Sequence, residues 1–427
     1  MAAVVMTDTE RDAYRATVQR RTLRLLFGTN IAGGIGTTIG VTVGGVLAAR
    51  LGGVQVSGFA SSASVIGAAL LAVPVARLMS RFGRRPGLAT AYLIGAAGAG
   101  IVVLAARAGS IWLMLLGMLL FGGGSTANLQ ARYSAVDLAD PGHRARQLSL
   151  IVWATTIGAV AAPNFASTAD SVLHRSGAPA LTGPFIVSIG VFAVAAVLLL
   201  TLLRPDPLLT AQRLHARVDD PPRSTTGQAW QAIMASTDAR LAIGAVTTGH
   251  LVMVAVMSMT PVHIMGGAHD DADLLRLVGI VLSVHVAGMY AFSPLVGWAA
   301  DRFGRRTVIV TGVAVLLSAC LVAGTAGHAT PRLTAGLLLL GLGWSCMVVS
   351  GSTLLSESVP ALVRPTAQGL SDLTMGVAAA VGGALAGYVV DLFSYGTLTV
   401  VAAIATVPSL ALALRRNVLA GAPGEGV

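Results

Sequence analysis

The feature that most constrains this chain is a series of long apolar segments, each close in length to the thickness of a lipid bilayer. A transmembrane helix needs about 20 mainly apolar residues, and such segments recur from residue 23 to residue 414. Apolar residues make up 55% of the 427 residues and charged residues only 11%, whereas a soluble protein carries about 25% charged residues. The segments are continuous rather than alternating, which excludes a transmembrane β-barrel. We therefore predict an all-α, multi-pass membrane protein.

The apolar segments predict twelve transmembrane helices in two pseudo-symmetric halves of six. The predicted helices cover about 23–45, 56–78, 87–107, 109–130, 147–170 and 183–203 in the first half, and about 241–263, 275–297, 307–326, 332–353, 366–389 and 394–414 in the second. Pro, Asp and Arg are concentrated between the halves. The predicted organisation is therefore an N-terminal half at 1–203, a linker at 204–240 and a C-terminal half at 241–427.

The basic residues predict the orientation in the membrane. All 28 are Arg, and 23 of them fall on one side of the predicted helices. Because cytoplasmic loops of membrane proteins carry the excess of positive charge, we expect both termini and the linker in the cytoplasm of a bacterial cell, with the helices in its inner (plasma) membrane. Arg in these loops contacts anionic lipid headgroups, so the net charge of +10 does not indicate nucleic acid. We expect a monomer.

A short basic sequence, R-F-G-R-R, occurs once in each half, at Arg81–Arg85 and at Arg302–Arg306. Both copies follow the second predicted helix of their half, which indicates an internal duplication. The second copy resembles the loop signature of the major facilitator superfamily, Gly-x-x-x-Asp-Arg-x-Gly-Arg-Arg/Lys. The matching residues are Gly297, Asp301, Arg302, Gly304, Arg305 and Arg306 in the second copy, and Arg81, Gly83, Arg84 and Arg85 in the first.

The resemblance to the major facilitator superfamily covers nearly the whole chain and implies a secondary active transporter. In this family the loop acts as a conformational latch between the halves, and the substrate path lies at their interface. The first copy departs from the signature, because Ala76 stands in place of Gly and Ser80 in place of Asp. The resemblance therefore implies that the latch depends mainly on Asp301, which could cap or pair with a neighbouring helix end.

Methionine and histidine are concentrated in the seventh and eighth predicted helices. Met253 and Met257 have i,i+4 spacing, as do His285 and Met289, so each pair lies on one helix face. Thioether and imidazole groups are ligands for a soft cation such as Cu(I). Met as pliable core packing is the alternative interpretation. The pattern resembles the CcoA-like branch of the superfamily, bacterial copper importers, which implies that these four residues handle copper as a substrate.

Other polar residues in or near the predicted helices are candidates for the substrate path: Asn30, Asn128, Gln130, Asn164 and His250. Asp372 is a candidate for proton coupling because an acid inside a membrane is usually functional; a role at the helix end is the alternative. We interpret Arg132 either as a residue that reaches the interface or as part of a cytoplasmic gate.

The predicted function is uptake of copper driven by an ion gradient. The chain has no Lys, so it has no Walker-type ATP-binding motif. We find no nucleophile–base set, and we predict neither an enzyme nor a bound cofactor. The alternative is a proton-coupled transporter of a small organic molecule, in drug efflux or in uptake of a vitamin or metabolite, with the methionines as a pliable pocket wall.

Overall fold

The structure is a computed structural model that describes residues 7–53, 57–215, 225–265 and 271–414, and the regular elements within these ranges are all helical. The N-terminal half contains α1 (Asp8–Gly52), α2 (Ser57–Phe82), α3 (Arg84–Ala108), α4 (Ile111–Ser134), the short 3-10 helix η2 (Pro141–His143), α5 (Arg144–Arg175) and α6 (Gly183–Leu202). The linker contains α7 (Pro207–His215) and α8 (Thr226–Ala235). The C-terminal half contains α9 (Thr237–Met265), α10 (Asp271–Tyr290), α11 (Ser293–Phe303), α12 (Arg305–Gly324), α13 (Thr330–Ser358), α14 (Arg364–Leu392), α15 (Tyr395–Ile404) and α16 (Val407–Leu414).

The described helices confirm the predicted all-α membrane fold. Eleven stretches of helix are long and apolar enough to cross a membrane. The helix α5, with 32 residues, packs against α1 and α11 and covers the fifth crossing predicted from the sequence. The first helix begins earlier than predicted, at Asp8. A capping box explains this start, because the Thr7 hydroxyl accepts the Glu10 N–H and the Glu10 carboxylate accepts the Thr7 N–H.

Two of the predicted transmembrane helices are each divided into two segments. The eighth is divided into α10 and α11, and the twelfth into α15 and α16. In both cases the second segment has proline at its second position, at Pro294 and Pro408. Proline lacks an N–H, so it fits the first turn of a helix and removes a hydrogen bond from a helix interior. The sequence pattern therefore predicted the crossings correctly and missed the interruptions.

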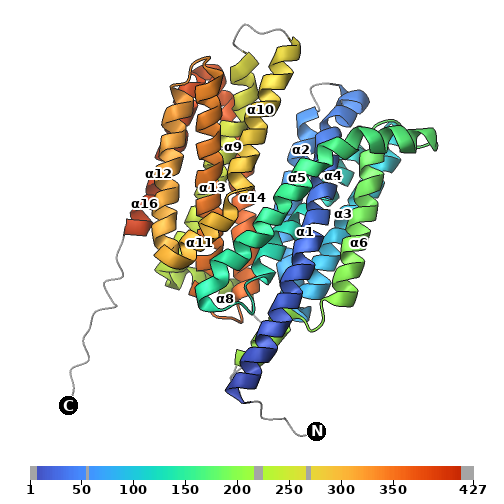
Figure 1. Cartoon of the computed structure of the whole chain (residues 1–427). Helices are drawn as coiled ribbons and strands as arrows, with labels where there is room; N and C mark the ends of the chain where they lie inside the picture. Colours follow the sequence, from blue (N-terminus) through green and yellow to red (C-terminus); the bar gives the residue numbers. More distant parts are fainter. Residues whose placement is uncertain (1–6, 54–56, 216–224, 266–270, 415–427) are drawn as a thin grey trace.

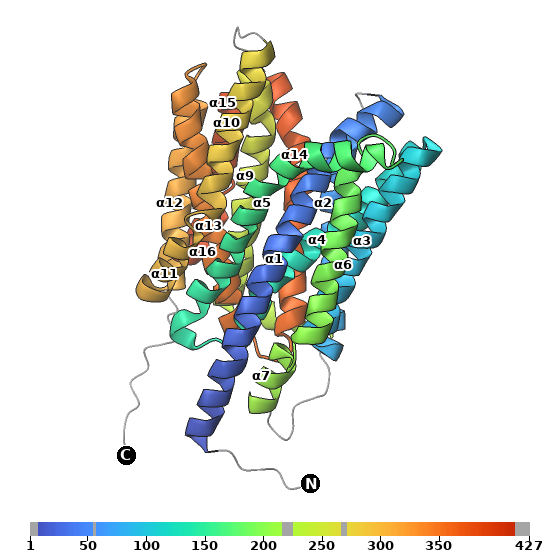
Figure 2. The same cartoon turned by 45° about the vertical axis from the view of Figure 1, so that its right-hand side comes forward.

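The two halves lie side by side and are joined mainly at one end (Figure 1). We call this the linker end, because the start of α1, the end of α16 and the linker helices α7 and α8 lie there (Figures 1 and 2). In both views the two halves diverge toward the opposite end. Contacts between the halves pair α2 with α14 and α11 with α5, which is the reciprocal pattern expected of an internal duplication.

Small residues allow α2 and α14 to approach closely near the linker end. A Cβ added to Gly369 would collide with Ala76, and one added to Gly376 would collide with Ala69. Small side chains at helix interfaces let the backbones of membrane helices pack tightly. Beyond Gly376 the exposed side chains of α14 include Val377, Val381 and Leu385.

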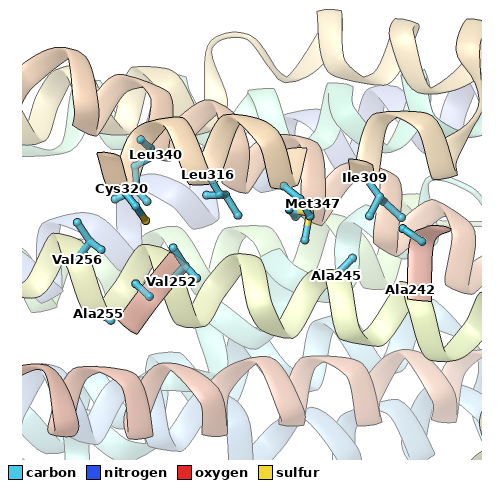
Figure 3. Packing of buried hydrophobic residues seen from close by; sticks show 14 of the residues in the cluster. Ala242, Ala245, Val252, Ala255, Val256, Ile309, Leu316, Cys320, Leu340 and Met347 are labelled. Carbon is cyan, nitrogen blue, oxygen red and sulfur yellow. The ribbon is translucent and has the colours of Figure 1, made fainter. Parts of the chain in front are cut away.

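Each half has its own apolar core. In the C-terminal half, Val252 and Val256 of α9 pack with Leu316 of α12 and with Leu340 and Met347 of α13 (Figure 3). Cys320, also shown there, is buried in the same cluster and acts as a small apolar packing residue. The N-terminal half has a corresponding core of aromatic and aliphatic side chains, with Phe121, Phe185 and Phe192 at its centre.

Candidate functional site

A central cavity of about 480 Å³ lies between the two halves. Four helices of each half line it: α1, α2, α4 and α5 from the first, and α9, α10, α13 and α14 from the second. Its wall combines four methionines and the rings of Tyr290 and Trp344 with ten polar or charged side chains. The lining includes Asn30, Asn128, Arg132, His250, Met253, Met257, Met289, Tyr290, Trp344, Asp372 and Met375. The volume fits a small organic molecule.

The floor of the cavity is an ion pair that joins the two halves. Nη2 of Arg132, on α4, lies 2.6 Å from Oδ1 of Asp372, on α14. The two side chains are 3% and 2% exposed, so the pair is shielded from solvent. The side-chain amide of Gln130 donates a second hydrogen bond to Asp372, at 2.8 Å. Arg132 is therefore not a residue that reaches the interface, and its position agrees with the alternative of a gate between the halves.

A second buried polar contact lies beneath this floor, closer to the linker end. Arg84 begins α3 and pairs with Asp137 through two hydrogen bonds, at 2.8 and 3.1 Å. The same guanidinium donates to the side-chain oxygen of Gln368 on α14, at 2.7 Å. Gln368 in turn donates to Ser356 of α13. Two layers of buried hydrogen bonds thus close the linker end of the cavity.

The methionine and histidine residues predicted to bind copper are only partly brought together. Met253, Met257 and Met289 line the cavity, and Met375 joins them from α14. His285 is fully buried and does not line the cavity. Its Nδ1 lies 2.9 Å from the carbonyl oxygen of Leu337 on α13, so this helix face is turned toward α13. The i,i+4 spacing fixed which residues share a face, but not the direction of that face.

The hydrogen bonds of the two histidines determine their tautomers. Trp344 Nε1–H donates to Nδ1 of His250 at 2.9 Å, so the neutral imidazole of His250 carries its proton on Nε2 and is a donor there. A nitrogen that carries a proton does not bind a metal. In His285 the Leu337 carbonyl accepts from Nδ1, so Nε2 holds a lone pair, and this atom has no hydrogen-bond partner among the described residues.

The remaining substrate-path candidates have different positions. Asn30 lines the cavity and ties α1 to α5, since its amide donates to the Ile151 carbonyl and to Thr155. Asn128 lines the cavity and accepts a hydrogen bond from Tyr92. Gln130 is fully buried and acts through Asp372. Asn164 belongs to α5, but its side chain lies outside the residues whose side chains the structure describes.

The second R-F-G-R-R copy connects the two halves through Asp301. Its carboxylate accepts the backbone N–H groups of Ala145 and Arg146, at 3.1 and 2.9 Å, at the start of α5. A carboxylate at a helix N-terminus is favoured by the helix dipole. Arg305 pairs with Asp301 and with Glu357, and also donates to the Pro141 carbonyl of the other half. Two other arginines of this loop differ in their surroundings, since Arg306 pairs with Asp238 and Arg302 is exposed. The two glycines are also constrained: a Cβ on Gly297 would collide with Ser149, and Gly304 has a φ of +92°.

The first copy is held by a carboxylate from the linker. Asp206 accepts the Arg85 N–H at 2.7 Å and caps α7 by accepting the N–H groups of Leu208 and Leu209. Gly83 has a φ of +93°, and an added Cβ would collide with the Asp206 carboxylate. Arg81 is exposed. A carboxylate is therefore present beside this loop although Ser80 replaces the Asp of the signature, but it acts within one half and does not bridge to the other.

Three features of the site were not predicted from the sequence. Tyr290 and Trp344 line the cavity, but aromatic residues are common in membrane helices and gave no distinguishing signal. Asp206 belongs to a polar linker in which acids are unremarkable. The pairing of Arg132 with Asp372 had no local signal, because the two residues lie 240 positions apart in the chain.

Comparisons with known proteins agree with this architecture. The family model described as Major Facilitator Superfamily matches residues 25–276 and 270–424. The chain is 36% identical to YddS, described as an uncharacterized MFS-type transporter of Bacillus subtilis (strain 168), over 90% of this chain and 88% of the relative. It is 25% identical to the riboflavin transporter RfnT of Brucella anthropi, over 84% of this chain and 86% of the relative. The crystal structure of the E. coli fucose:proton symporter FucP (N162A) is similar in fold, with a TM-score of 0.66 at 16% identity, over 92% of this chain and 97% of that one. The chain belongs to the major facilitator superfamily of membrane transporters.

Proposed function

We propose that this chain is a proton-coupled transporter of a small organic molecule in the inner membrane of a bacterium. The observation that carries the proposal is the ion pair between Arg132 and Asp372, because it combines a titratable acid, a contact between the halves and a place at the cavity floor. A proton or a substrate that reaches Asp372 from the cavity acts directly on the contact that holds the linker end closed. This is the connection that a coupled transporter needs.

The Arg distribution supports a cytoplasmic linker end. In that orientation the structure is an outward-facing state, with its halves joined on the cytoplasmic side. Opening toward the cytoplasm requires α4 and α14 to separate, and separation leaves two opposite charges without partners in a poorly polar environment. The cost of an uncompensated buried charge is about 3–5 kcal/mol. Protonation of Asp372 removes one of the two charges, so proton uptake favours the transition.

An organic substrate is better supported than copper. The cavity of about 480 Å³ is far larger than a bare metal ion requires, and His250 presents a proton rather than a lone pair on Nε2. The four cavity methionines act as a pliable wall for an apolar group. The similarity to a riboflavin transporter adds weight to an organic molecule. Copper stays the second candidate because of His285, which lies four residues before Met289. Its Nε2 lone pair has no hydrogen-bond partner among the described residues.

Uptake into liposomes tests the proposal. Wild-type and Asp372→Asn protein would be reconstituted and given an acid-outside gradient. The external solution would contain a defined mixture of small organic molecules that includes riboflavin, and the internal solutes would be measured by mass spectrometry. We expect the wild type to accumulate an organic solute above its external concentration, and a protonophore to abolish this accumulation. The Asp372→Asn variant should exchange the solute without accumulating it.

The same liposomes test copper in a parallel arm with radioactive copper under reducing conditions. Accumulation of copper by the wild type would replace the organic-substrate proposal. Accumulation of an organic solute that resists the protonophore would leave a transporter but refute proton coupling. Empty liposomes and liposomes with the Arg132→Gln, Asp372→Asn double variant provide the controls for leakage.

A further inference from the structure

The guanidinium of Arg132 has unused hydrogen-bonding capacity directed at the central cavity. Arg132 lines the cavity, and its hydrogen bonds use a single nitrogen, Nη2, which contacts Asp372 at 2.6 Å and the Tyr133 hydroxyl at 3.3 Å. Its Cζ also lies 4.8 Å from the centre of the Tyr133 ring. Its Nε is buried and has no partner among the described residues. A guanidinium has five N–H groups in a fork that suits two oxygens of one carboxylate. The contact with Asp372 therefore leaves room for a second anionic group.

The surroundings of the ion pair supply no replacement for Asp372. The charged and titratable groups that face the pair are Tyr133 on α4, Arg84 on α3, Tyr290 on α10 and His250 on α9. None of these carries a negative charge near neutral pH. Asp137, in the turn that follows α4, is held by Arg84 through two hydrogen bonds. When the halves separate, the counter-charge for Arg132 must therefore come from outside the protein.

We propose that the transported molecule carries an anionic oxygen group, a carboxylate or a phosphate, and that Arg132 binds this group in exchange for Asp372. This inference rests on the proposed proton-coupled transport and names the substrate class for it. The anion replaces the counter-charge that Asp372 provided to Arg132. A proton from the solution on the open side neutralises Asp372. One negative charge and one proton then move together, so transport of a monoanion is electrically neutral.

The rest of the cavity indicates what the anionic group is attached to. On the side of the C-terminal half the wall includes Met253, Met289, Met375 and Trp344, which pack together in one apolar cluster. These side chains suit an aliphatic or aromatic body. His250 adds an N–H donor on Nε2 at the same level of the cavity, because its Nδ1 accepts from Trp344. The substrate class is therefore an organic acid with an apolar body and an acceptor beyond its charged end.

Binding of benzoate and its neutral analogue benzamide to purified protein tests this exchange without any gradient. Binding would be measured by intrinsic tryptophan fluorescence, since Trp344 lines the cavity. In the Asp372→Asn variant Arg132 is released, and we expect benzoate to bind at least about 10-fold more tightly than benzamide. The Arg132→Gln, Asp372→Asn double variant is the matched control, and there the preference for benzoate should disappear.

Each alternative result overturns the inference. Equal binding of the two compounds to Asp372→Asn, binding of neither, or an unchanged preference in the double variant would show that Arg132 does not hold a substrate anion. If Asp372→Asn does not fold, wild-type protein at pH 5.5 and pH 8 provides the second measurement. We expect benzoate, but not benzamide, to bind more tightly at pH 5.5, because the proposed exchange couples the binding of the anion to the uptake of a proton by Asp372. A failure here leaves the liposome experiment intact, because that experiment tests proton coupling with solutes of any charge.

Discussion

The strongest prediction concerns the stability of the buried pair formed by Arg132 and Asp372. The two side chains are 3% and 2% exposed, and their nearest atoms are 2.6 Å apart. Replacing Asp372 by Asn keeps the size of the side chain but leaves the Arg132 charge without its counter-ion. Removal of one partner from a buried pair costs about 3–5 kcal/mol, whereas replacement of both by neutral groups is close to neutral. We therefore expect Asp372→Asn to destabilise the protein, and the further change Arg132→Gln to restore most of the loss.

The expected size of the effect follows from the length of the chain. An unfolding entropy of about 2.1 cal/mol/K per residue over 427 residues makes each kcal/mol worth about 1 °C in Tm. A loss of about 3–5 kcal/mol then lowers Tm by about 3–6 °C. The assay is thermal unfolding of purified protein in one detergent, with the wild type, both single variants and the double variant measured together. The double-mutant cycle isolates the interaction between the two side chains.

A double variant as unstable as Asp372→Asn would refute this prediction. The loss of stability would then come from the contact with Gln130 or from packing, rather than from the unpaired charge of Arg132. An Asp372→Asn variant with the same Tm as the wild type would also refute it. In that case Arg132 reaches water or another anion in the folded state, and the pair is not a contact that the halves must break.

Three further predictions concern the loops and the cavity wall. Gly83→Ala should destabilise the protein by about 1–3 kcal/mol more than Gly304→Ala, because both have a φ near +90° but only Gly83 faces the Asp206 carboxylate; equal melting temperatures would contradict the collision. Asp301→Asn should weaken the contact with α5 by about 0.5–2 kcal/mol. In a background with Cys320 and Cys346 replaced by Ala, it should therefore speed the alkylation of a Ser149→Cys reporter at this contact. An unchanged alkylation rate would count against the latch. Met289→Leu, which conserves volume, should change the KM for an organic substrate by less than about 10-fold, whereas complete loss of transport would point to the sulfur as a metal ligand.

The sequence predicted the general architecture because its signals are local. Each apolar segment indicates a membrane crossing by itself, and the R-F-G-R-R copies mark the same loop in each half. The identity of Asp372 as an unusual acid was also readable, because a carboxylate inside a membrane helix is rare. Its partner was not readable, since Arg132 lies 240 residues away in the chain, and a helix-end Arg is compatible with a role at the membrane interface.

The copper prediction shows where helical periodicity stops being informative. Spacing establishes that His285 and Met289 share a face of α10, but the rotation of α10 about its axis depends on packing with α13. Gly341 of α13 allows the close approach, because a Cβ there would collide with the backbone of α10 at His285. This contact brings His285 to the Leu337 carbonyl, while Met289, one turn later, is left at the edge of the cavity.

The two copies of the basic loop differ in a way that bears on coupling. Asp301 bridges the halves by capping α5, whereas Asp206 holds the other loop within its own half. The interface of α2 with α14 therefore lacks a carboxylate latch at its surface. The polar contacts of α14 with the N-terminal half come instead from α3 and α4, where Arg84 donates to Gln368 and where Arg132 and Gln130 donate to Asp372.

This asymmetry makes one of the two interfaces responsive to the cavity. Asp301 lies at the linker end with a side chain only 6% exposed, and it does not line the cavity, so a substrate bound in the cavity does not contact it. Arg132 and Asp372 lie at the cavity floor, so a substrate anion and a proton can compete directly for the groups that hold α14 against the N-terminal half. A missing surface carboxylate at Ser80 thus transfers control of this interface to residues that the substrate can reach. Restoring the carboxylate with Ser80→Asp should add a contact that the substrate cannot displace, and so slow transport. Benzoate binding to Asp372→Asn protein should stay unchanged when Ser80→Asp is added. Faster transport by Ser80→Asp would refute this division of roles.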